Sequence, residues 1–228
     1  MATAGMEVLV LERGPYPGAK SCGGLSIVSE HVHGLFPNFW EECQCERVIT
    51  NLGYWFMTED SMLALTYHSL RLTAAPYSRF TVKRTNLYKW LAAKAVAAGA
   101  TLLFGHTVKH LIFDGNQAVG VQVAAPQNTV FYGNIMVLAD GANALVAEQS
   151  GLLPPVSPQN MALYVKETIA LAPEIIESRF NLLPGQGAIW GLIGYPTNGF
   201  NGTASLHTFK DSISINVGMA VSNFANLP

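Results

Sequence analysis

Hydrophobic runs separated by turn residues divide the first third of the chain into short predicted elements. Residues 8–12 (Val-Leu-Val-Leu-Glu) form an apolar run that ends in an acid and predicts a strand. The Gly/Pro/Ser-rich stretch 14–26 predicts a loop. Scattered apolar positions over 28–46 predict one or two short helices. Residues 48–57 and 62–68 flank Thr-Glu-Asp-Ser, so they predict a β-hairpin.

The middle of the chain contains the clearest helical pattern. Apolar residues recur at helical spacing over 85–98, with Thr85 or Asn86 as the N-cap and Gly99 as the stop. The β segments expected after it are 101–104, the hairpin of 108–114 with 118–124 around Asp-Gly-Asn, and 131–138. Ile135–Ala139 is a continuous apolar run, which is the pattern of a central parallel strand.

The last third of the chain is mostly β in pattern. Residues 154–159 (Pro-Pro-Val-Ser-Pro-Gln) form the best internal boundary. A helix is expected where Pro173 opens the sequence Glu-Ile-Ile-Glu-Ser-Arg-Phe. The expected strands are 160–168, 187–195, 202–209 and 212–221. The layout is therefore mixed α/β, and we expect the 48–68 hairpin to pair with strands that follow residue 160.

Composition and charge narrow the function classes. The net charge is −2 and no basic run exists, so nucleic acid is not an expected partner. Hydrophobic residues make up 50% and charged residues 12%, which suggests thick buried sheets or a surface that meets something else. No window approaches the roughly 18 apolar residues of a membrane helix. The three cysteines, Cys22, Cys43 and Cys45, have no framework spacing and indicate a reducing, cytoplasmic compartment; no second pair or His cluster accompanies Cys43-x-Cys45, so no metal is expected.

The strand that ends at Glu12 is the first chemical signal. In a dinucleotide-binding βαβ unit the second strand ends in an acid that binds the adenosine ribose, with a glycine turn about 20 residues upstream. Only Met1–Glu7 precede this strand, and the chain contains no Gly-x-Gly-x-x-Gly. We therefore expect the chain to begin inside the first helix of such a fold.

Six segments together support a family resemblance. They are VLVLERG, PGAKSCGG, KRTNLYKWLAAKAVAAGA, NIMVLADGANALVA, LYVKETIAL, and the stretch from IWGLIGYP to KDSISINVGMAV. In this order they resemble the FixC-type flavoproteins and the electron-transfer-flavoprotein:ubiquinone oxidoreductases. This family lies near the geranylgeranyl reductases in one superfamily of FAD-dependent enzymes.

The resemblance implies a fold and a reaction. The fold is α/β, with an incomplete FAD-binding Rossmann-like domain of the glutathione-reductase type (1–47 and 77–153) and a β-rich substrate domain (48–76 and 154–228). The function is FAD-dependent transfer of electrons from an electron-transfer-flavoprotein-like donor to a quinone or a ferredoxin-like acceptor. The location would be cytoplasmic, with peripheral membrane contact allowed. Two alternatives stay open, namely a non-catalytic remnant or interaction domain, and a flavin-dependent isoprenoid reductase.

The resemblance also assigns residues, while no catalytic side chain is predicted. Glu12 would hold the ribose, Arg84 the FAD phosphates, and the main chain of Val108 the adenine. The full cofactor set is Glu12, Arg13, Lys20, Cys22, Gly23, Gly24, Arg84, Val108, Asp140 and Gly141. Trp190 and Tyr195 would line an apolar substrate cavity. Each has a plain structural alternative, such as a solvated strand end, a flexible loop, an Asp-Gly turn or an aromatic core.

Two further expectations concern this chain by itself. The glycine motif upstream and the later Gly-Asp motif of the family are both absent from the sequence, so we expect a fragment that holds FAD weakly. We also expect aggregation, because a nucleotide-domain sheet without its first strand exposes strand edges.

Overall fold

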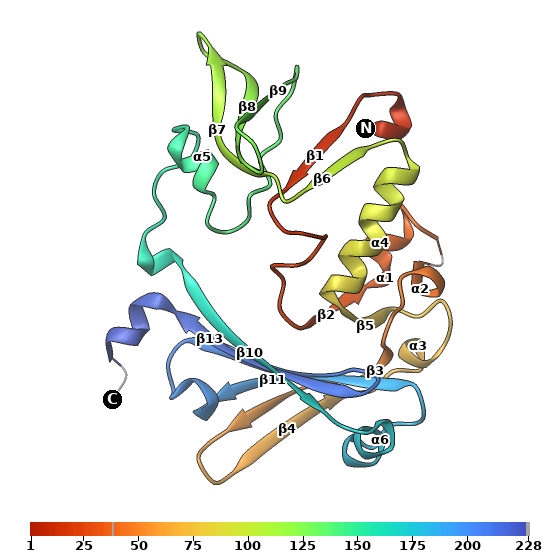
Figure 1. Cartoon of the computed structure of the whole chain (residues 1–228). Coiled ribbons are helices and arrows are strands. Elements are labelled where there is room, and N and C mark those ends of the chain that lie inside the picture. Colours follow the sequence, from red (N-terminus) through yellow and green to blue (C-terminus); the bar gives the residue numbers. More distant parts are fainter. Residues whose placement is uncertain (38, 227–228) are drawn as a thin grey trace. The chain divides into compact units, whose positions relative to one another are not determined.

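Two compact units make up the structure, a computed structural model that describes residues 1–37 and 39–226 (Figure 1). Unit 1 contains residues 1–20 and 88–156, and unit 2 contains residues 21–87 together with the chain from Ser157 onward. Residues 38, 227 and 228 fall in the helical region predicted at 28–46 and in the predicted second domain, and they lie outside the described residues.

A parallel pair of strands opens unit 1. Strand β1 (Leu9–Glu12) pairs with β6 (Thr101–Phe104), with Leu9 opposite Thr101 and Glu12 opposite Phe104. The helix before β6 is α4 (Arg84–Ala97), which starts in unit 2 and ends before Gly99, whose φ of +97° suits glycine. The predicted strands at 8–12 and 101–104 and the predicted helix at 85–98 are confirmed.

A three-stranded antiparallel sheet forms the other part of unit 1. It consists of β7 (Thr107–Asp114), β8 (Gln117–Ala125) and β9 (Thr129–Tyr132), and the predicted hairpin is confirmed. The small core on this sheet contains Leu111, Val121 and Val146, the last from helix α5 (Leu145–Gln149). A 3-10 turn at Ala2–Ala4 precedes β1.

The predicted central strand at Ile135–Ala139 is not formed. The predicted 131–138 strand ends at Tyr132, and residues 134–140 belong to no described strand. Met136 and Leu138 pack against the small core, whereas Ile135 and Val137 are 77% and 70% exposed. An apolar run becomes a central strand only when strands lie on both of its sides, and the parallel sheet described in unit 1 contains β1 and β6 alone.

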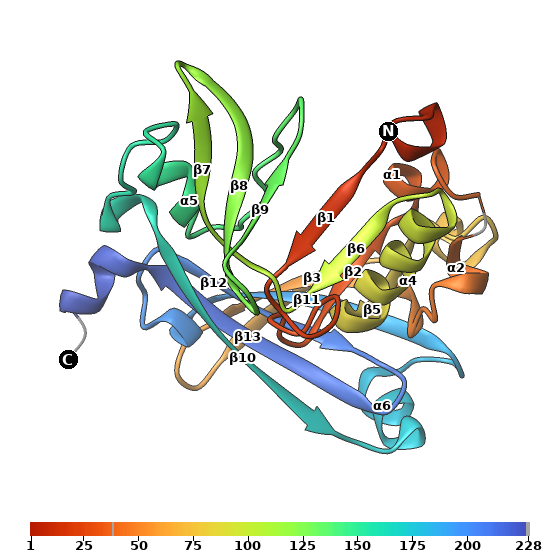
Figure 2. The same ribbon diagram turned by 45° about the horizontal axis from the view of Figure 1, so that its top comes forward.

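Unit 2 is built on one eight-stranded sheet (Figure 2). Its order is β10-β13-β12-β11-β3-β5-β2, and β4 pairs with β3. The strands are β2 (Gly24–Val28), β3 (Arg47–Met57), β4 (Met62–Tyr67), β5 (Arg79–Lys83), β10 (Ala162–Ala170), β11 (Gln186–Gly194), β12 (Gly202–Thr208) and β13 (Ser212–Ala220). The β3–β4 hairpin and the parallel pairing of β3 with β11 confirm the expected return of this hairpin to the late strands.

Short helices accompany this sheet. They are α1 (Ser29–His33), α2 (Phe39–Glu42), α3 (Leu70–Thr73) and α6 (Pro173–Phe180), with 3-10 turns at Pro158–Asn160, Tyr195–Thr197 and Val221–Asn226. Helix α6 begins at the predicted proline and covers one face of the sheet. Its Ile176 joins Trp190, Leu206 and Ile213 in the main core of unit 2.

The boundary between the units differs from the predicted domain boundary. Residues 21–47 and 77–87 were expected in the nucleotide-binding domain, but they lie in unit 2. The reason is strand pairing, because β5 pairs with β3 at Arg47–Val48 and β2 pairs with β5 along its whole length. The predicted loop over 14–26 therefore ends early, since Gly24–Ser26 already belong to β2.

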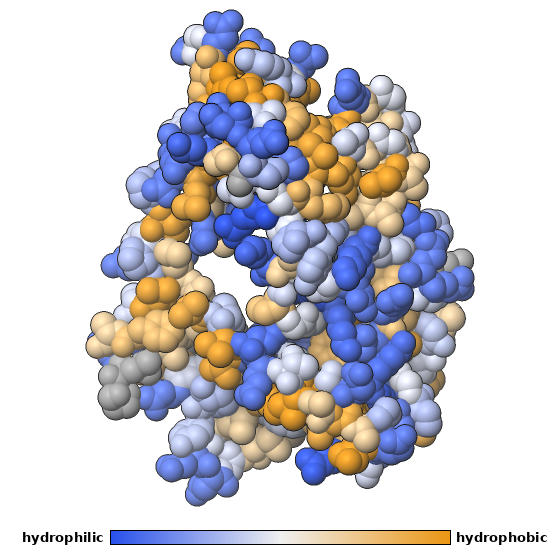
Figure 3. All heavy atoms as spheres, in the orientation of Figure 1, coloured by the Kyte–Doolittle hydropathy of each residue, from blue (hydrophilic) through white to orange (hydrophobic). Residues whose placement is uncertain are grey.

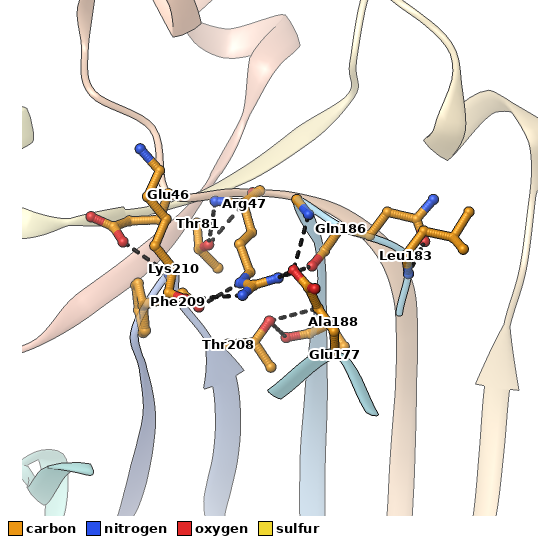
Figure 4. Close-up of polar contacts among 11 residues, drawn as sticks. Glu46, Arg47, Thr81, Glu177, Leu183, Gln186, Ala188, Thr208, Phe209 and Lys210 are labelled. Carbon is orange, nitrogen blue, oxygen red and sulfur yellow. Dashed lines mark hydrogen bonds and ion pairs between the residues drawn. The ribbon is translucent and has the colours of Figure 1, made fainter. Parts of the chain in front are cut away.

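A buried arginine ties three segments of unit 2 together (Figure 4). Arg47 is 3% exposed. Its Nη1 donates to Glu177 Oε1 and to the carbonyl of Gln186, both at 2.9 Å, and its Nη2 donates to the carbonyl of Lys210 at 2.9 Å. The Arg47 guanidinium holds the pKa of Glu177 below its usual value, with help from the amide of Gly185.

Many large apolar side chains reach the surface (Figure 3). Every residue of β4 is exposed, and Leu63 and Tyr67 are 63% and 58% exposed. The exposed apolar side chains agree with the high hydrophobic content of the sequence. An exposed apolar surface favours association of the protein with other molecules. Among the described residues, no helix combines the length and apolarity that crossing a membrane requires.

Candidate cofactor site

In unit 1 the expected ribose acid lies at the carboxyl end of two parallel strands. Glu12 is the last residue of β1, and its Oε1 accepts a hydrogen bond from the amide of Gly14 at 2.6 Å. Its carbonyl accepts from the amide of His106, which follows β6, at 2.9 Å. Ligands of open α/β sheets bind outside the carboxyl ends of the strands, and this end carries Glu12. Arg13 and Lys20 are exposed.

The loop after Glu12 is held against α4 within the same unit. The Lys89 ammonium of α4 lies 4.9 Å from the centre of the Tyr16 ring, which is cation–π distance. The amide of Gly105 donates to the carbonyl of Gly14 at 2.9 Å. These contacts hold the backbone that follows Glu12 in place, and this backbone includes Gly14, whose amide binds the Glu12 carboxylate.

The main chain near Val108 departs from regular pairing. Val108 lies opposite Val123 and His110 lies opposite Gln122, so Lys109 has no opposite residue on β8. This is a β-bulge, and a bulge leaves main-chain groups outside the ladder. The Val108 side chain packs against the small core of unit 1, as the plain structural alternative expects, while its backbone stands at the bulge.

Asp140 and Gly141 form a turn that starts α5. Asp140 Oδ2 accepts from the amide of Val146 at 2.9 Å, and the carbonyl of Gly141 accepts from the amide of Ala144 at 3.1 Å. Gly141 has a φ of +83°, a conformation that favours glycine. The structure thus gives both residues a direct role in turn geometry, as the plain alternative for Asp-Gly expects.

In unit 2 the two glycines of the expected cofactor set, Gly23 and Gly24, are packed against other residues. A Cβ on Gly23 would lie 2.3 Å from Lys166 Cδ, and a Cβ on Gly24 would lie 2.1 Å from Phe209 Cζ. The Lys166 and Phe209 side chains fill the space that a Cβ at these two positions would need, so packing requires glycine at both. Cys22, just before them, is exposed with a free thiol.

Two basic residues contact this glycine pair, Lys166 through its side chain and Arg84 through its main chain. Lys166 Nζ donates to the carbonyl of Gly24 at 2.8 Å, and the Arg84 amide donates to the carbonyl of Gly23 at 3.2 Å. Arg84 Nε is buried and has no hydrogen-bond partner. Burial lowers the pKa of Lys166, and the charge of Arg84 lowers it further. The main chain of Arg84 therefore lies beside the glycine pair, and the Lys166 side chain contacts the same pair.

A histidine in the same unit is held neutral. His207 on β12 has its pKa lowered to about 4, mainly by burial and then by the charges of Lys166 and Arg79. Its Nε2 lies 3.1 Å from Ser205 Oγ. The sequence gives His207 no predicted role, and Lys166 appears only inside the matched segment LYVKETIAL. Their contacts depend on pairing between distant strands, and no local sequence signal reports that.

The two expected substrate residues lie in different settings, one buried and one exposed. Trp190 is 5% exposed and packs with Trp55 and Phe180, with ring centres 5.2 and 5.0 Å away. It belongs to the core under α6, as an aromatic residue inside a strand commonly does. Tyr195 opens a 3-10 turn and is 52% exposed.

The cysteines and histidines do not assemble a metal centre in the part of the chain that the structure describes. Cys43 and Cys45 contact each other, and their shared hydrogen bond lowers the pKa of Cys43 and raises that of Cys45. Burial also raises the pKa of the Cys45 thiol.

The residues present are chemically suited to hold FAD in part. Glu12 offers a carboxylate at the carboxyl edge of parallel strands, which suits ribose hydroxyls. Arg84 offers a buried N–H group without a partner, which suits an anionic group. On the Cβ side of Gly23 and Gly24 the space is occupied by Lys166 and Phe209.

No family model matches the chain. It is 34% identical over 226 residues, 99% of its length, to Probable electron transfer flavoprotein-quinone oxidoreductase YdiS of Escherichia coli K12. It is also 35% identical over 225 residues to Protein FixC of Bradyrhizobium diazoefficiens. The chain spans about half the length of these curated relatives, 52% in both cases.

Solved structures share the fold. A geranylgeranyl bacteriochlorophyll reductase-like protein from Thermoplasma acidophilum matches 97% of the chain and 52% of its own chain, at a TM-score of 0.71 and 15% identity. The myxobacterial FAD-dependent halogenase CndH matches 99% and 50%, at a TM-score of 0.70 and 20% identity. The resemblance to FixC and the flavoprotein-quinone oxidoreductases, and the mixed α/β flavoprotein fold class, are therefore confirmed.

Proposed function

We propose that this chain carries part of the FAD site of an oxidoreductase that passes electrons from an electron-transfer-flavoprotein-like donor to a quinone or a ferredoxin-like acceptor. The observation that carries this proposal is the similarity to FixC and to the flavoprotein-quinone oxidoreductase over 98–99% of the chain. The relatives are about twice as long as the matched region, so the complete reaction belongs to the proposal.

Each unit would contribute a separate binding function. In unit 1 the Glu12 carboxylate would accept hydrogen bonds from ribose hydroxyls, and the Gly14 amide would keep that carboxylate in place. The main chain at the Val108 bulge would contact the adenine. In unit 2 the Arg84 guanidinium would bind phosphate oxygens, for which its planar arrangement of donors is suited.

The redox chemistry would come from the cofactor. FAD, when bound, accepts and releases electrons, while the protein binds and orients it. No side chain described here is needed to move a proton in that scheme. Asp140 and Gly141 would act through the shape of the turn that starts α5.

A titration with FAD tests this proposal. We expect weak but saturable binding, seen as a change in flavin fluorescence, because the sequence holds no Gly-x-Gly-x-x-Gly to grip the pyrophosphate. The variant Glu12→Gln should bind FAD about ten-fold more weakly, since it replaces a charge-assisted hydrogen bond. The exposed Glu7, five positions earlier, gives the matched control Glu7→Gln.

Two results would count against the proposal. One is the absence of any FAD-dependent signal, which would favour the non-catalytic alternative. The other is equal FAD affinity in Glu12→Gln, Glu7→Gln and the unaltered chain. The isoprenoid-reductase alternative has no separate support, because the likeness to the reductase-like structure shows the fold alone.

A further inference from the structure

Strand β4 is an open edge of the sheet in unit 2. Among the described residues β4 pairs with β3 alone, so the other side of the strand has no neighbouring strand (Figure 1). Every residue of β4 is exposed, including the large apolar side chains of Leu63, Leu65 and Tyr67. A strand whose edge and side chains are both open is a template for pairing with another chain.

The backbone groups that point away from β3 belong to alternate residues of β4. The Thr58 amide donates to the Ser61 carbonyl at 2.9 Å, so these two residues form a hydrogen-bonded pair at the turn. The register then runs without a shift to the end of β4, and bonded and non-bonded pairs alternate along an antiparallel ladder. The amides and carbonyls of Met62, Ala64 and Thr66 therefore point outward.

The sequence of β4 contains nothing that opposes pairing with a second chain. Edge strands of natural proteins commonly carry charged side chains, above all lysine, or a proline or a bulge. Strand β10, another edge of this sheet, has Lys166 and Glu167 near its centre. Strand β4 reads Met-Leu-Ala-Leu-Thr-Tyr and has no charge, no proline and no shift of register. The contrast indicates that β10 is protected against pairing and that β4 is available for it.

A second copy of the chain fits the β4 edge by symmetry. Antiparallel pairing of two β4 strands about Ala64 uses all three outward-facing residues, with Met62 opposite Thr66 of the second copy. Any other symmetric register leaves at least one of the three without a partner in the strand. The same register brings Leu63 opposite Leu65 of the second copy, and apolar pairs across strands stabilise a sheet. Such an interface is the same on both chains and closes after two of them.

The charges beyond the two ends of β4 favour the same occupant. Glu59 and Asp60 lie in the turn before β4, whereas His68 and Arg71 follow it. All four residues are exposed, and the ion pairs among the described residues do not include them. The register about Ala64 places Asp60 beside His68 of the second copy, and the symmetry repeats this contact at the other end. An acidic end therefore meets a basic end twice, which is electrostatic complementarity of the strand to itself.

We propose that β4 is a dimerisation edge, at which a second copy of this chain pairs antiparallel about Ala64. The two eight-stranded sheets of unit 2 then form one continuous sheet across the dimer. The occupant is another molecule of this protein, because an uncharged strand between an acidic and a basic end is complementary to itself. The inference goes beyond the proposed function, since β4 contains no residue assigned to FAD and the dimer forms without it.

Sedimentation velocity over a range of protein concentrations tests the proposal. As the concentration rises, the unaltered chain should pass from a monomer to a species of twice its mass. Ala64→Lys should weaken this association about 100-fold, because it brings two ammonium groups opposite each other at the two-fold axis. Ala162→Lys makes the same change at an exposed position of the other edge strand, β10, and should leave the association unchanged.

A complementary pair of variants tests the register and the folding of the variants together. Ala64→Glu should also be monomeric, because two carboxylates meet at the axis. An equimolar mixture of Ala64→Glu and Ala64→Lys should form a dimer that contains one chain of each, since opposite charges then face each other. Recovery of this mixed dimer supports the proposal and shows that both variants are folded. If both variants show the circular dichroism of the unaltered chain and still remain monomeric when mixed, the proposal is overturned.

Two further results would overturn the proposal. One is an unaltered chain that is monomeric at every concentration; if that monomer floats with vesicles of phosphatidylcholine and phosphatidylglycerol, the exposed strand belongs to a lipid surface instead. The other is an association that Ala64→Lys leaves intact, since β4 then takes no part in it. All of these measurements are made without FAD, so a failure of the proposed FAD function leaves their outcome unaffected.

Discussion

The buried histidine of unit 2 makes the stability of this protein depend on pH in a calculable way. His207 is neutral at pH 7, and its pKa is lowered from 6.5 to about 4 by burial and by the charges of Lys166 and Arg79. Acidification is therefore the perturbation. Between pH 6.5 and about 4 the unfolded chain takes up a proton at this position and the folded chain does not.

The sign and the size of the effect follow from proton linkage. A folded state that binds fewer protons than the unfolded state loses stability as pH falls. With pKa values of 6.5 unfolded and about 4 folded, His207 should cost the fold about 2 kcal/mol between pH 7 and pH 5. The full loss, about 3 kcal/mol, is reached below pH 4.

Urea unfolding of the unaltered chain and of His207→Gln at pH 7, 6 and 5 measures this difference. The carboxylates Glu177 and Asp211 have lowered pKa values, so their contributions are lost only as pH falls from about 4.5 and 3.8 downward. The variant should therefore show about 2 kcal/mol less destabilisation over this range than the unaltered chain. Identical pH dependence in the two proteins would refute the assignment of a buried neutral His207.

Three further outcomes are expected. Gly24→Ala should destabilise the fold by about 1–3 kcal/mol, because the new Cβ meets Phe209 and the Val82 carbonyl. The control Gly34→Ala should be neutral or stabilising, because its Cβ meets nothing within 4 Å and the residue has a φ of −60°. Chemical denaturation compares the free energies of unfolding of the two variants. Arg47→Met should cost about 2 kcal/mol or more by the same assay, since it removes the hydrogen bonds that the buried guanidinium donates to the carbonyls of Gln186 and Lys210. Backbone amides of residues 134–140 should exchange with deuterium within seconds, because these residues belong to no strand. Slow exchange, measured by mass spectrometry, would instead support the strand predicted from the sequence.

Local patterns were enough to predict most elements. The helix at 85–98 and the hairpin of 108–114 with 118–124 depend on neighbours in the sequence, and both formed close to the predicted limits. The run at 135–139 failed because its pattern reports apolar surface and not the presence of a partner strand. A local pattern also does not report which strand pairs with which. This explains why the unit boundary differs from the predicted one, since no residue near Arg79–Lys83 indicates that this strand pairs with β3.

In the candidate site, too, residues with a local sequence signal were predictable, and residues that depend on contacts between distant segments were not. Glu12 was predictable because an acid at a strand end is a local signal, and the structure places it at the carboxyl end of a parallel pair. The role of Lys166 was not predictable, since its contact joins residues 142 positions apart. Trp190 shows the converse, because an aromatic residue in a strand reads alike whether it faces a core or a cavity, and only the position of α6 decides.

Two like charges lie near the glycine pair and act against stability. The charge of Arg84 lowers the pKa of Lys166, so the two side chains repel each other. The hydrogen bonds to the two glycine carbonyls come from the Lys166 ammonium and from the main-chain amide of Arg84. It follows that Arg84→Gln, which relieves the repulsion without disturbing the Gly24 contact, should be at least as stable as the unaltered chain. Urea unfolding at pH 7 compares the two proteins. A purely structural arginine would instead leave the variant less stable than the unaltered chain.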